Sequence, residues 1–198
     1  MLKSGITKQK TFPDVPAANL DHLKELLKIE DESEDDYLTR QLMAATIYAQ
    51  NYLNRSLIYT TWQRQYDMQE QSRGLRQEYR SKPWAVLPYT PLKEITKIVT
   101  VDRDGDETPI TSYYLDDVSE PERVYITKEL QGREIAYLLI EYQSGYGPTY
   151  EDIPFVIQQG ILQHAAYMAE HRGDCGAKEA ARESGATNIY GMMKVELI

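Results

Sequence analysis

The feature that most constrains the fold is a change of apolar spacing near residue 55. Residues 34–53 carry an apolar series that begins at Leu38 and Leu42 and steps by four and three, which is the spacing of one helix face. Residues 57–143 instead form short segments rich in β-branched and aromatic residues, separated by turn residues. A chain that changes from helical to strand-like patterns predicts an α+β fold.

Three helices are predicted, over residues 20–29, 34–53 and 154–172. Asn19 is a suitable N-cap for the first helix, and Asn54 is a suitable left-handed end for the second. The third begins with a proline, which a helix tolerates in its first turn. We therefore expect an α+β, mainly α fold, in which a small helical bundle carries a compact antiparallel β insertion and extended termini.

The two ends of the chain are predicted to extend from a domain over residues 19–172. Residues 1–18 contain prolines and no sustained apolar period, which indicates an arm that is loose or ordered on a neighbour. Residues 173–198 predict a short helix followed by a strand-like tail. Because this tail is too apolar to remain in water, it either adds to the sheet edge of another protein or packs on its own subunit. Its apolar residues are Ile189, Tyr190, Met192, Met193, Val195, Leu197 and Ile198.

An acidic run precedes the second helix. Ser33 followed by Asp36 matches a capping box, and carboxylates are favourable at the positive end of a helix. The run is therefore predicted to be a solvated cap, and the same residues can present a negative surface to a channel or to a basic partner. Its carboxylates are Glu30, Asp31, Glu32, Glu34, Asp35 and Asp36.

The net charge of -9 argues against a protein that grips nucleic acid, because phosphate binding requires clustered Lys and Arg. The proportions of 41% hydrophobic and 27% charged residues are typical of a soluble globular chain. The longest apolar stretch, residues 135–140, is too short to span a bilayer, and the start MLKSGITKQK contains no apolar signal core. We therefore expect synthesis in a cytoplasm and no membrane contact.

Candidate catalytic chemistry is weak in this sequence. The segment DRDGDE around Gly105 superficially resembles a calcium loop, but its glycine is misplaced and the required glutamate is absent, so a hairpin turn is the better interpretation. Cys175 has no activating partner in sequence. Asp116, Asp117 and Glu141 represent the alternative hypothesis of a metal-dependent nuclease, although their spacing does not distinguish them from other carboxylates. We expect no enzyme activity, no metal and no cofactor.

Four segments, in this order, resemble the head-tail connector, or head-completion adaptor, family of tailed bacteriophages and gene-transfer particles. They are LDHLKELLKIED, AATIYAQNYLNRSLIYTTWQRQYD, LPYTPLKEITKIVTVDRDGDE and IEYQSGYGPTYEDIPFVIQQGILQHAAYMAEHR. The last is the most specific, since it joins a strand, a Gly-Tyr-Gly turn and an Ile-Pro helix start. The resemblance spans most of residues 19–172, and none of its motifs is catalytic.

The resemblance implies a virion structural protein at the head-tail interface, made in the host cytoplasm. Subunits of this family form a ring below the portal, with roughly a dozen copies joined by head-to-tail contacts. The implied partners are the portal protein, the next tail-completion or stopper protein, and duplex DNA that passes during packaging and ejection without specific binding. An acidic subunit suits such a conduit, because positive charge would retard the duplex.

Three contact surfaces are predicted on this basis. The apolar tail is expected to dock to the portal, and the six carboxylates of the acidic run are expected to face the channel. The polar segment 71–82 and the Asp-Gly hairpin are expected to contact the next tail component, through Arg73, Arg76, Arg80, Asp104 and Gly105. An alternative is an assembly or binding module that never enters the particle, which its presence or absence in purified virions would decide.

Overall fold

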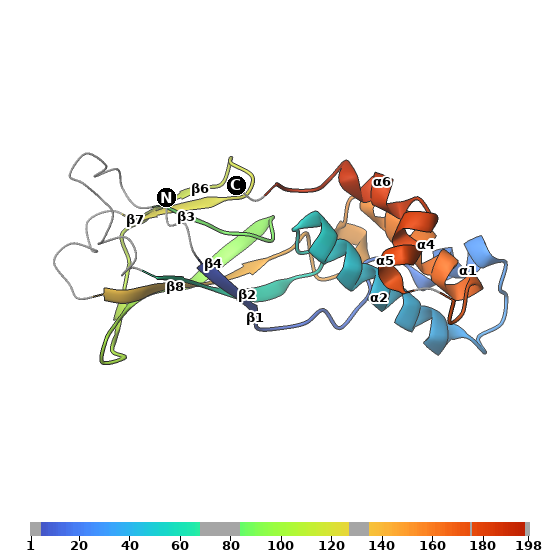
Figure 1. Cartoon of the computed structure of the whole chain (residues 1–198), viewed down its shortest axis with the longest axis horizontal. Helices are drawn as coiled ribbons and strands as arrows, with labels where there is room; N and C mark the ends of the chain where they lie inside the picture. The colour runs from blue at the N-terminus through green and yellow to red at the C-terminus, as the bar shows by residue number, and fades with distance from the viewer. Residues whose placement is uncertain (1–4, 68–83, 127–134, 175, 197–198) are drawn as a thin grey trace. The chain divides into compact units, whose positions relative to one another are not determined.

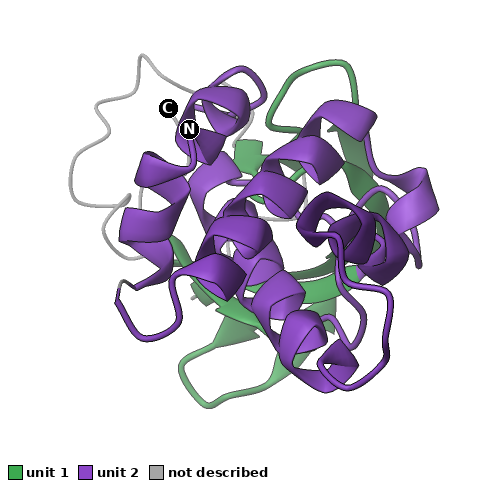
Figure 2. Cartoon of the chain, turned by 90° about the vertical axis from the view of Figure 1, so that its right-hand side faces the viewer, with its two compact units in different colours: residues 1–12, 60–144 green, residues 13–59, 145–198 purple. Residues whose placement is uncertain are grey.

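A computed structural model of the chain describes residues 5–67, 84–126, 135–174 and 176–196. The chain forms two compact units, coloured separately in Figure 2. We call residues 1–12 and 60–144 the sheet unit, and residues 13–59 and 145–198 the helical unit. Each unit is therefore assembled from two separate stretches of sequence.

The helices of the helical unit begin and end close to the predicted positions. Asn19 caps the first helix as predicted, because its side chain accepts a hydrogen bond from the N–H of Asp21 at 2.6 Å. Asn54 ends the second helix with a φ of 54°, which confirms the predicted left-handed end. The elements are α1 (Leu20–Leu27), α2 (Asp35–Leu53), the 3-10 turn η1 (Tyr150–Asp152), α4 (Phe155–Glu170), α5 (Ala177–Glu183) and α6 (Ala186–Gly191).

The core of the helical unit lies between α2 and α4 (Figure 1). Leu38 and Leu42 on α2 and Ile157 and Ile161 on α4 are fully excluded from solvent, as their helical spacing predicts. Alanines occupy several of the other buried positions of both helices, which allows their backbones to approach closely. The short helices α5 and α6 pack against α4.

The sheet unit contains two antiparallel sheets. The five-stranded sheet has the order β1-β2-β8-β4-β5, and the three-stranded sheet has the order β3-β7-β6. The Asp-Gly hairpin predicted around Gly105 is confirmed, since it joins β4 to β5. The strands are β1 (Gly5–Gln9), β2 (Thr60–Asp67), β3 (Trp84–Val86), β4 (Leu92–Asp102), β5 (Glu107–Pro109), β6 (Tyr113–Asp116), β7 (Arg123–Ile126) and β8 (Ile135–Ser144).

Both sheets contribute to one buried core. Leu138 and Ile140 of β8 alternate inward from the larger sheet, and Val124 of β7 meets them from the smaller sheet. Two buried tyrosines of the larger sheet also bond to the end of β3 and to the segment after it, because Tyr66 donates its hydroxyl to the carbonyl of Val86 and Tyr142 donates to that of Pro88. Burial raises the pKa of both phenols, so they act as neutral donors.

The α+β class is confirmed, but the expectation of a mainly α chain is not, because helices and strands occupy similar shares of the described residues. Strands β4 and β8 are 11 and 10 residues long and belong to a unit with its own core. The N-terminal arm is also more ordered than expected: residues 5–9 form β1, which pairs with β2. No helix in the described part of the chain has the length and apolarity needed to cross a membrane.

Candidate functional site

The acidic run Glu30–Asp36 joins α1 to α2 in the helical unit. The predicted capping box is wrong, because α2 begins at Asp35 with Glu34 at its N-cap and no side chain caps it. The N–H of Ser33 donates instead to the Asp31 carboxylate at 2.8 Å, and the Ser33 hydroxyl donates to the same oxygen. These two hydrogen bonds lower the pKa of Asp31, so it carries its charge as a turn-forming group.

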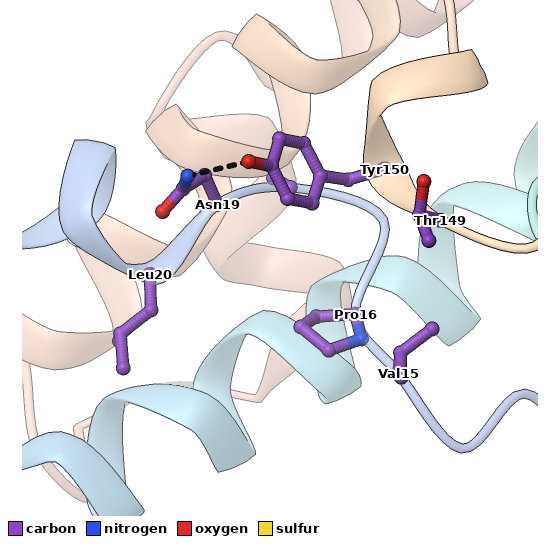
Figure 3. A pocket seen from close by; sticks show the side chains of 7 residues that line it. Val15, Pro16, Asn19, Leu20, Thr149 and Tyr150 are labelled. Atoms are coloured by element: carbon purple, nitrogen blue, oxygen red, sulfur yellow. Dashed lines mark hydrogen bonds between the residues drawn. The ribbon is translucent and has the colours of Figure 1, made fainter.

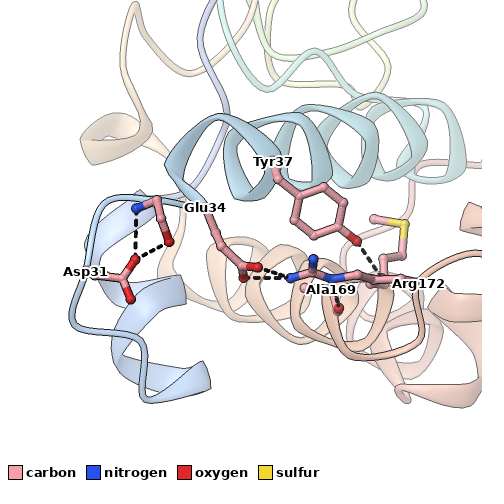
Figure 4. A network of polar contacts seen from close by, with 7 residues as sticks. Asp31, Glu34, Tyr37, Ala169 and Arg172 are labelled. Carbon is pink, nitrogen blue, oxygen red and sulfur yellow. Dashed lines mark hydrogen bonds and ion pairs between the residues drawn. The ribbon is translucent and has the colours of Figure 1, made fainter.

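Two of the six carboxylates are held by ion pairs within the helical unit. Asp35 accepts from Lys24 of α1 at 2.7 Å. Both oxygens of Glu34 accept from Arg172 at 2.6 Å, as Figure 4 shows. The Arg172 guanidinium also lies over the Tyr37 ring, 4.3 Å from its centre. The Glu34 carboxylate raises the pKa of Arg172. These contacts fasten the start of α2 to the end of α1 and to the segment after α4.

The remaining carboxylates of the run, Glu30, Glu32 and Asp36, are exposed and make no ion pair within the described residues. They belong to a unit that is acidic as a whole. The helical unit contains 16 Asp and Glu against eight Lys and Arg, whereas the sheet unit contains 15 against 14. Nearly all of the net charge therefore belongs to the helical unit, and Glu30, Glu32 and Asp36 present part of it to solvent.

The short helix predicted in the C-terminal segment is present as α5, but a second helix, α6, follows it, and residues 192–196 form neither helix nor strand. The apolar residues of this segment are divided between the core and the surface: Tyr190 of α6 and Val195 are buried, Ile189 and Met193 are half-buried, and Met192 is 74% exposed. Leu197 and Ile198 lie outside the described residues. The prediction of a strand-like tail is wrong for the described residues, because Gly191 lies at the end of a helix and not within a strand.

Three hydrogen bonds hold the chain after α6 to the end of α2. Asn54 donates its side-chain amide to the carbonyl of Val195 at 2.8 Å, and Arg55 donates from Nε to the carbonyl of Met193 at 2.7 Å. The N–H of Val195 donates to the carbonyl of Leu53 at 2.9 Å. A carbonyl at the end of α2 and two carbonyls of the segment after α6 therefore gain hydrogen-bond partners from each other's side of the contact.

A buried histidine anchors α5 and α6 to α4. His164 lies with Nε2 2.7 Å from the carbonyl oxygen of Ala177 and Nδ1 3.5 Å from the hydroxyl of Tyr190. Because a carbonyl can only accept, Nε2 carries the proton and Nδ1 accepts from Tyr190. The Tyr48 ring contacts the imidazole edge-on, 5.1 Å between centres. Burial lowers the pKa of His164, which keeps the ring neutral.

A mainly apolar pocket of about 300 Å³ lies beside the start of α1 (Figure 3). One side is formed by Val15, Pro16 and Leu20, and the other by Thr149 and Tyr150 at η1. The Asn19 side chain donates to the Tyr150 hydroxyl at 2.7 Å across this pocket. Its walls contain no arrangement of acid, base and nucleophile that a catalytic site would use. The pocket is therefore suited to binding an apolar group.

The other predicted contact residues lie in the sheet unit. Asp104 and Gly105 are exposed at the β4–β5 turn, where Asp102 accepts from the N–H groups of Asp104 and Asp106 at 3.0 and 2.9 Å. Gly105 adopts a φ of 94°, which favours glycine in this turn. Arg73, Arg76 and Arg80 lie outside the described residues.

The structure does not bring the carboxylates of the nuclease hypothesis together. Asp116 lies on β6 of the smaller sheet and accepts from the N–H and hydroxyl of Ser119 at 3.0 and 2.7 Å, whereas Glu141 lies on β8 of the larger sheet. These hydrogen bonds lower the pKa of Asp116. Among the described residues, no three His, Cys, Asp or Glu side chains gather where they could hold a metal ion.

Comparison with known proteins gives matches by family and by structure. Residues 17–80 match the family described as "Phage gp6-like head-tail connector protein". No curated protein matches the chain in sequence.

Solved structures match over nearly the whole length. A chain from the neck of an empty gene transfer agent (GTA) particle, computed with C6 symmetry, is 18% identical with a TM-score of 0.72. Chains from the virion of the native GTA particle and from its neck, computed with C12 symmetry, are each 19% identical, with TM-scores of 0.72 and 0.69. Each match covers 98% of this chain and 97% of the other.

At these identities the structural matches establish the fold, and the family match covers α1, α2 and β2. The resemblance predicted from the sequence is therefore confirmed. Residues 17–80 are similar to the phage head-tail connector family, and the whole chain has the fold of a chain found in the neck of gene transfer agent particles.

Proposed function

We propose that this protein is a structural subunit of a virion neck, a head-tail connector that joins the head to the tail and lets DNA pass. The observation that carries the proposal is the agreement of two independent comparisons, one with a connector family and one with the neck of a particle. The C6 and C12 symmetries of the similar necks support a ring of identical subunits. The subunit would act by contact and shape, not by catalysis.

The C-terminal segment is our candidate for docking to the portal. Met192 exposes most of its surface, and Ile189 and Met193 flank it with half-buried side chains. Tyr190 and Val195 hold this segment on the helical unit, so the exposed residues are presented from a fixed base. Methionine suits such a contact because its flexible side chain adapts to irregular apolar surfaces.

The exposed carboxylates Glu30, Glu32 and Asp36 are our candidates for the channel wall. Repeated around a ring, they would repel the phosphates of the passing duplex and prevent it from binding. Asp31, Glu34 and Asp35 would add to the negative potential, although each is engaged by a neighbouring group. The Asp-Gly turn at Asp104 and Gly105 would remain free for the next tail-completion or stopper protein.

The proposed ring is tested by measuring the mass of the assembly that the purified protein forms. We expect light scattering of the purified protein, alone and mixed with the portal of the same particle, to detect a ring-sized or portal-bound species in at least one condition. A monomer in both conditions, together with absence from purified virions, would contradict the connector function and favour an assembly factor.

Portal docking is tested by Met192→Asp, with Asn188→Asp on the exposed surface of α6 as the matched control. Both variants add one negative charge to the same helical segment. We expect only Met192→Asp to reduce portal binding. Equal binding by Met192→Asp and the unmodified protein would place the docking surface elsewhere.

A further inference from the structure

The two sheets of the sheet unit have four edge strands within the described part of the chain. β1 and β5 end the five-stranded sheet, and β3 and β6 end the three-stranded sheet (Figure 1). In an edge strand, every second residue turns its N–H and C=O away from the sheet, where another strand can pair with them. The β3 and β5 edges are less suitable, because each is three residues long and Pro109 of β5 has no N–H to donate, which leaves β1 and β6 as the open edges.

Both open edges expose large apolar side chains. Ile6 on β1 is 75% exposed, and Tyr114 on β6 is 65% exposed. Val118, two residues after β6, is 92% exposed. Soluble proteins usually protect strand edges from such exposure because an open apolar edge recruits other strands. These two edges are therefore suited to a protein contact.

The two edges carry opposite charge. β1 carries Lys8 and continues into Lys10, whereas β6 ends at Asp116 and continues into Asp117. Pairing two β1 edges would gather four lysines, and pairing two β6 edges would gather four aspartates. Pairing β1 with β6 instead brings lysines to aspartates, so charge selects the mixed contact and disfavours both symmetric ones.

We propose that β1 of one copy adds to β6 of the next copy in the ring, with the strands parallel. This direction places Ile6 beside Tyr114 and Lys8 beside Asp116 within the two strands. The antiparallel direction places Ile6 beside the Asp116 carboxylate, or beyond the end of β6 when Lys8 faces Asp116. The contact uses a different edge on each copy, so it is head-to-tail and can close by rotation, as a ring requires. The inference rests on the proposed function, since the ring provides the second copy.

Cysteine cross-linking in the assembled ring tests this pairing. One chain carries Ile6→Cys and Tyr114→Cys in a Cys175→Ser background, and the ring is confirmed by its mass before oxidation. A parallel β1–β6 contact joins each copy to the next, so a non-reducing gel should show dimers, trimers and higher multiples. The matched control carries Ile6→Cys with Thr108→Cys on β5, and each single variant is a second control.

The outcomes separate this inference from the proposed function. A ladder from the Ile6–Tyr114 pair but not from the controls supports the contact. A ring of normal mass without that ladder overturns the β1–β6 contact and leaves the connector function standing. A ladder that appears only when Ile6→Cys is combined with Asp116→Cys overturns the parallel direction. Absence of any ring from the unmodified protein, with and without the portal, overturns both proposals.

Discussion

The ring of Tyr190 lies against the backbone of Gly160, in the middle of α4. A Cβ added at Gly160 would come within 2.6 Å of Cε1 of Tyr190, closer than real side chains allow. Glycine is therefore required here by packing and not by backbone conformation. This contact brings α6 close enough to α4 for the Tyr190 hydroxyl to reach His164.

We expect Gly160→Ala to lower the free energy of unfolding by about 1–3 kcal/mol, because an extra methyl group in a close-packed core forces its neighbours apart. The higher helix propensity of alanine offsets part of this loss. Urea unfolding measures the change. Gly191→Ala is the matched control, since a Cβ there meets nothing within 4 Å. Equal stability of both variants would show that α6 shifts freely over α4.

Asn54 combines a left-handed backbone with a hydrogen bond to the carbonyl of Val195, and two substitutions separate these roles. Asn54→Gly keeps the backbone preference and removes the amide. Asn54→Ala also loses that preference, so it should cost about 1–2 kcal/mol more. Hydrogen exchange at the Val195 amide should accelerate in both variants if the tail is held as described. Unchanged protection in both would mean that the amide contributes nothing to the hold on the tail.

The stability of the helical unit should depend on the protonation of His164. Burial lowers the pKa of His164 in the folded state, so the unfolded chain binds the proton first as the pH falls. The free energy of unfolding should therefore be fully present above the ordinary histidine pKa, about 6.5, and should decline as the pH falls below it, by at most about 1.4 kcal/mol per pH unit.

His164→Gln, which retains a donor for the carbonyl of Ala177, tests the origin of this decline. We expect the variant to lose less stability than the unmodified protein between pH 7.5 and 5.5, measured by urea unfolding. Asp31 and Asp116 do not interfere, since their lowered pKa values place their titration at more acidic pH. The same pH dependence in both proteins would assign the effect to another group.

Local signals predicted the ends of the helices better than the assembly of the sheets. Asn19 and Asn54 could be identified because capping depends on neighbouring residues alone. The capping box predicted at Ser33 is wrong because the Ser33 hydroxyl bonds to the preceding Asp31 and not to a helix N–H. The sequence does not distinguish these two partners. The pairing of β1 with β2 joins residues far apart in the chain, which spacing cannot indicate.

The candidate contact residues could likewise be predicted only as groups, because the sequence does not show which members of a group pack within the fold. The exposed carboxylates were recognisable as a group. Glu34 and Asp35 differ from them because they pair with Arg172 and Lys24, and these ion pairs depend on tertiary packing. Tyr190 and Met192 are two residues apart and apolar, yet one is buried and the other exposed, because α6 turns Tyr190 toward Gly160. A strand would place Tyr190 and Met192 on the same face, so the strand-like interpretation could not indicate this division.

Reversing the exposed charges of the acidic run tests whether it lines the channel. In particles assembled with Glu30→Lys, Glu32→Lys and Asp36→Lys, phosphates would meet lysines, so DNA ejection should slow by about tenfold at low salt and recover as salt screens the contact. Glu151→Lys, Glu170→Lys and Asp174→Lys give the same charge change at other exposed positions of the helical unit. Slowing only in the first set would place the run at the DNA path. Equal slowing in both would instead make ejection respond to the charge of the whole unit, and the run would have no special place in the channel.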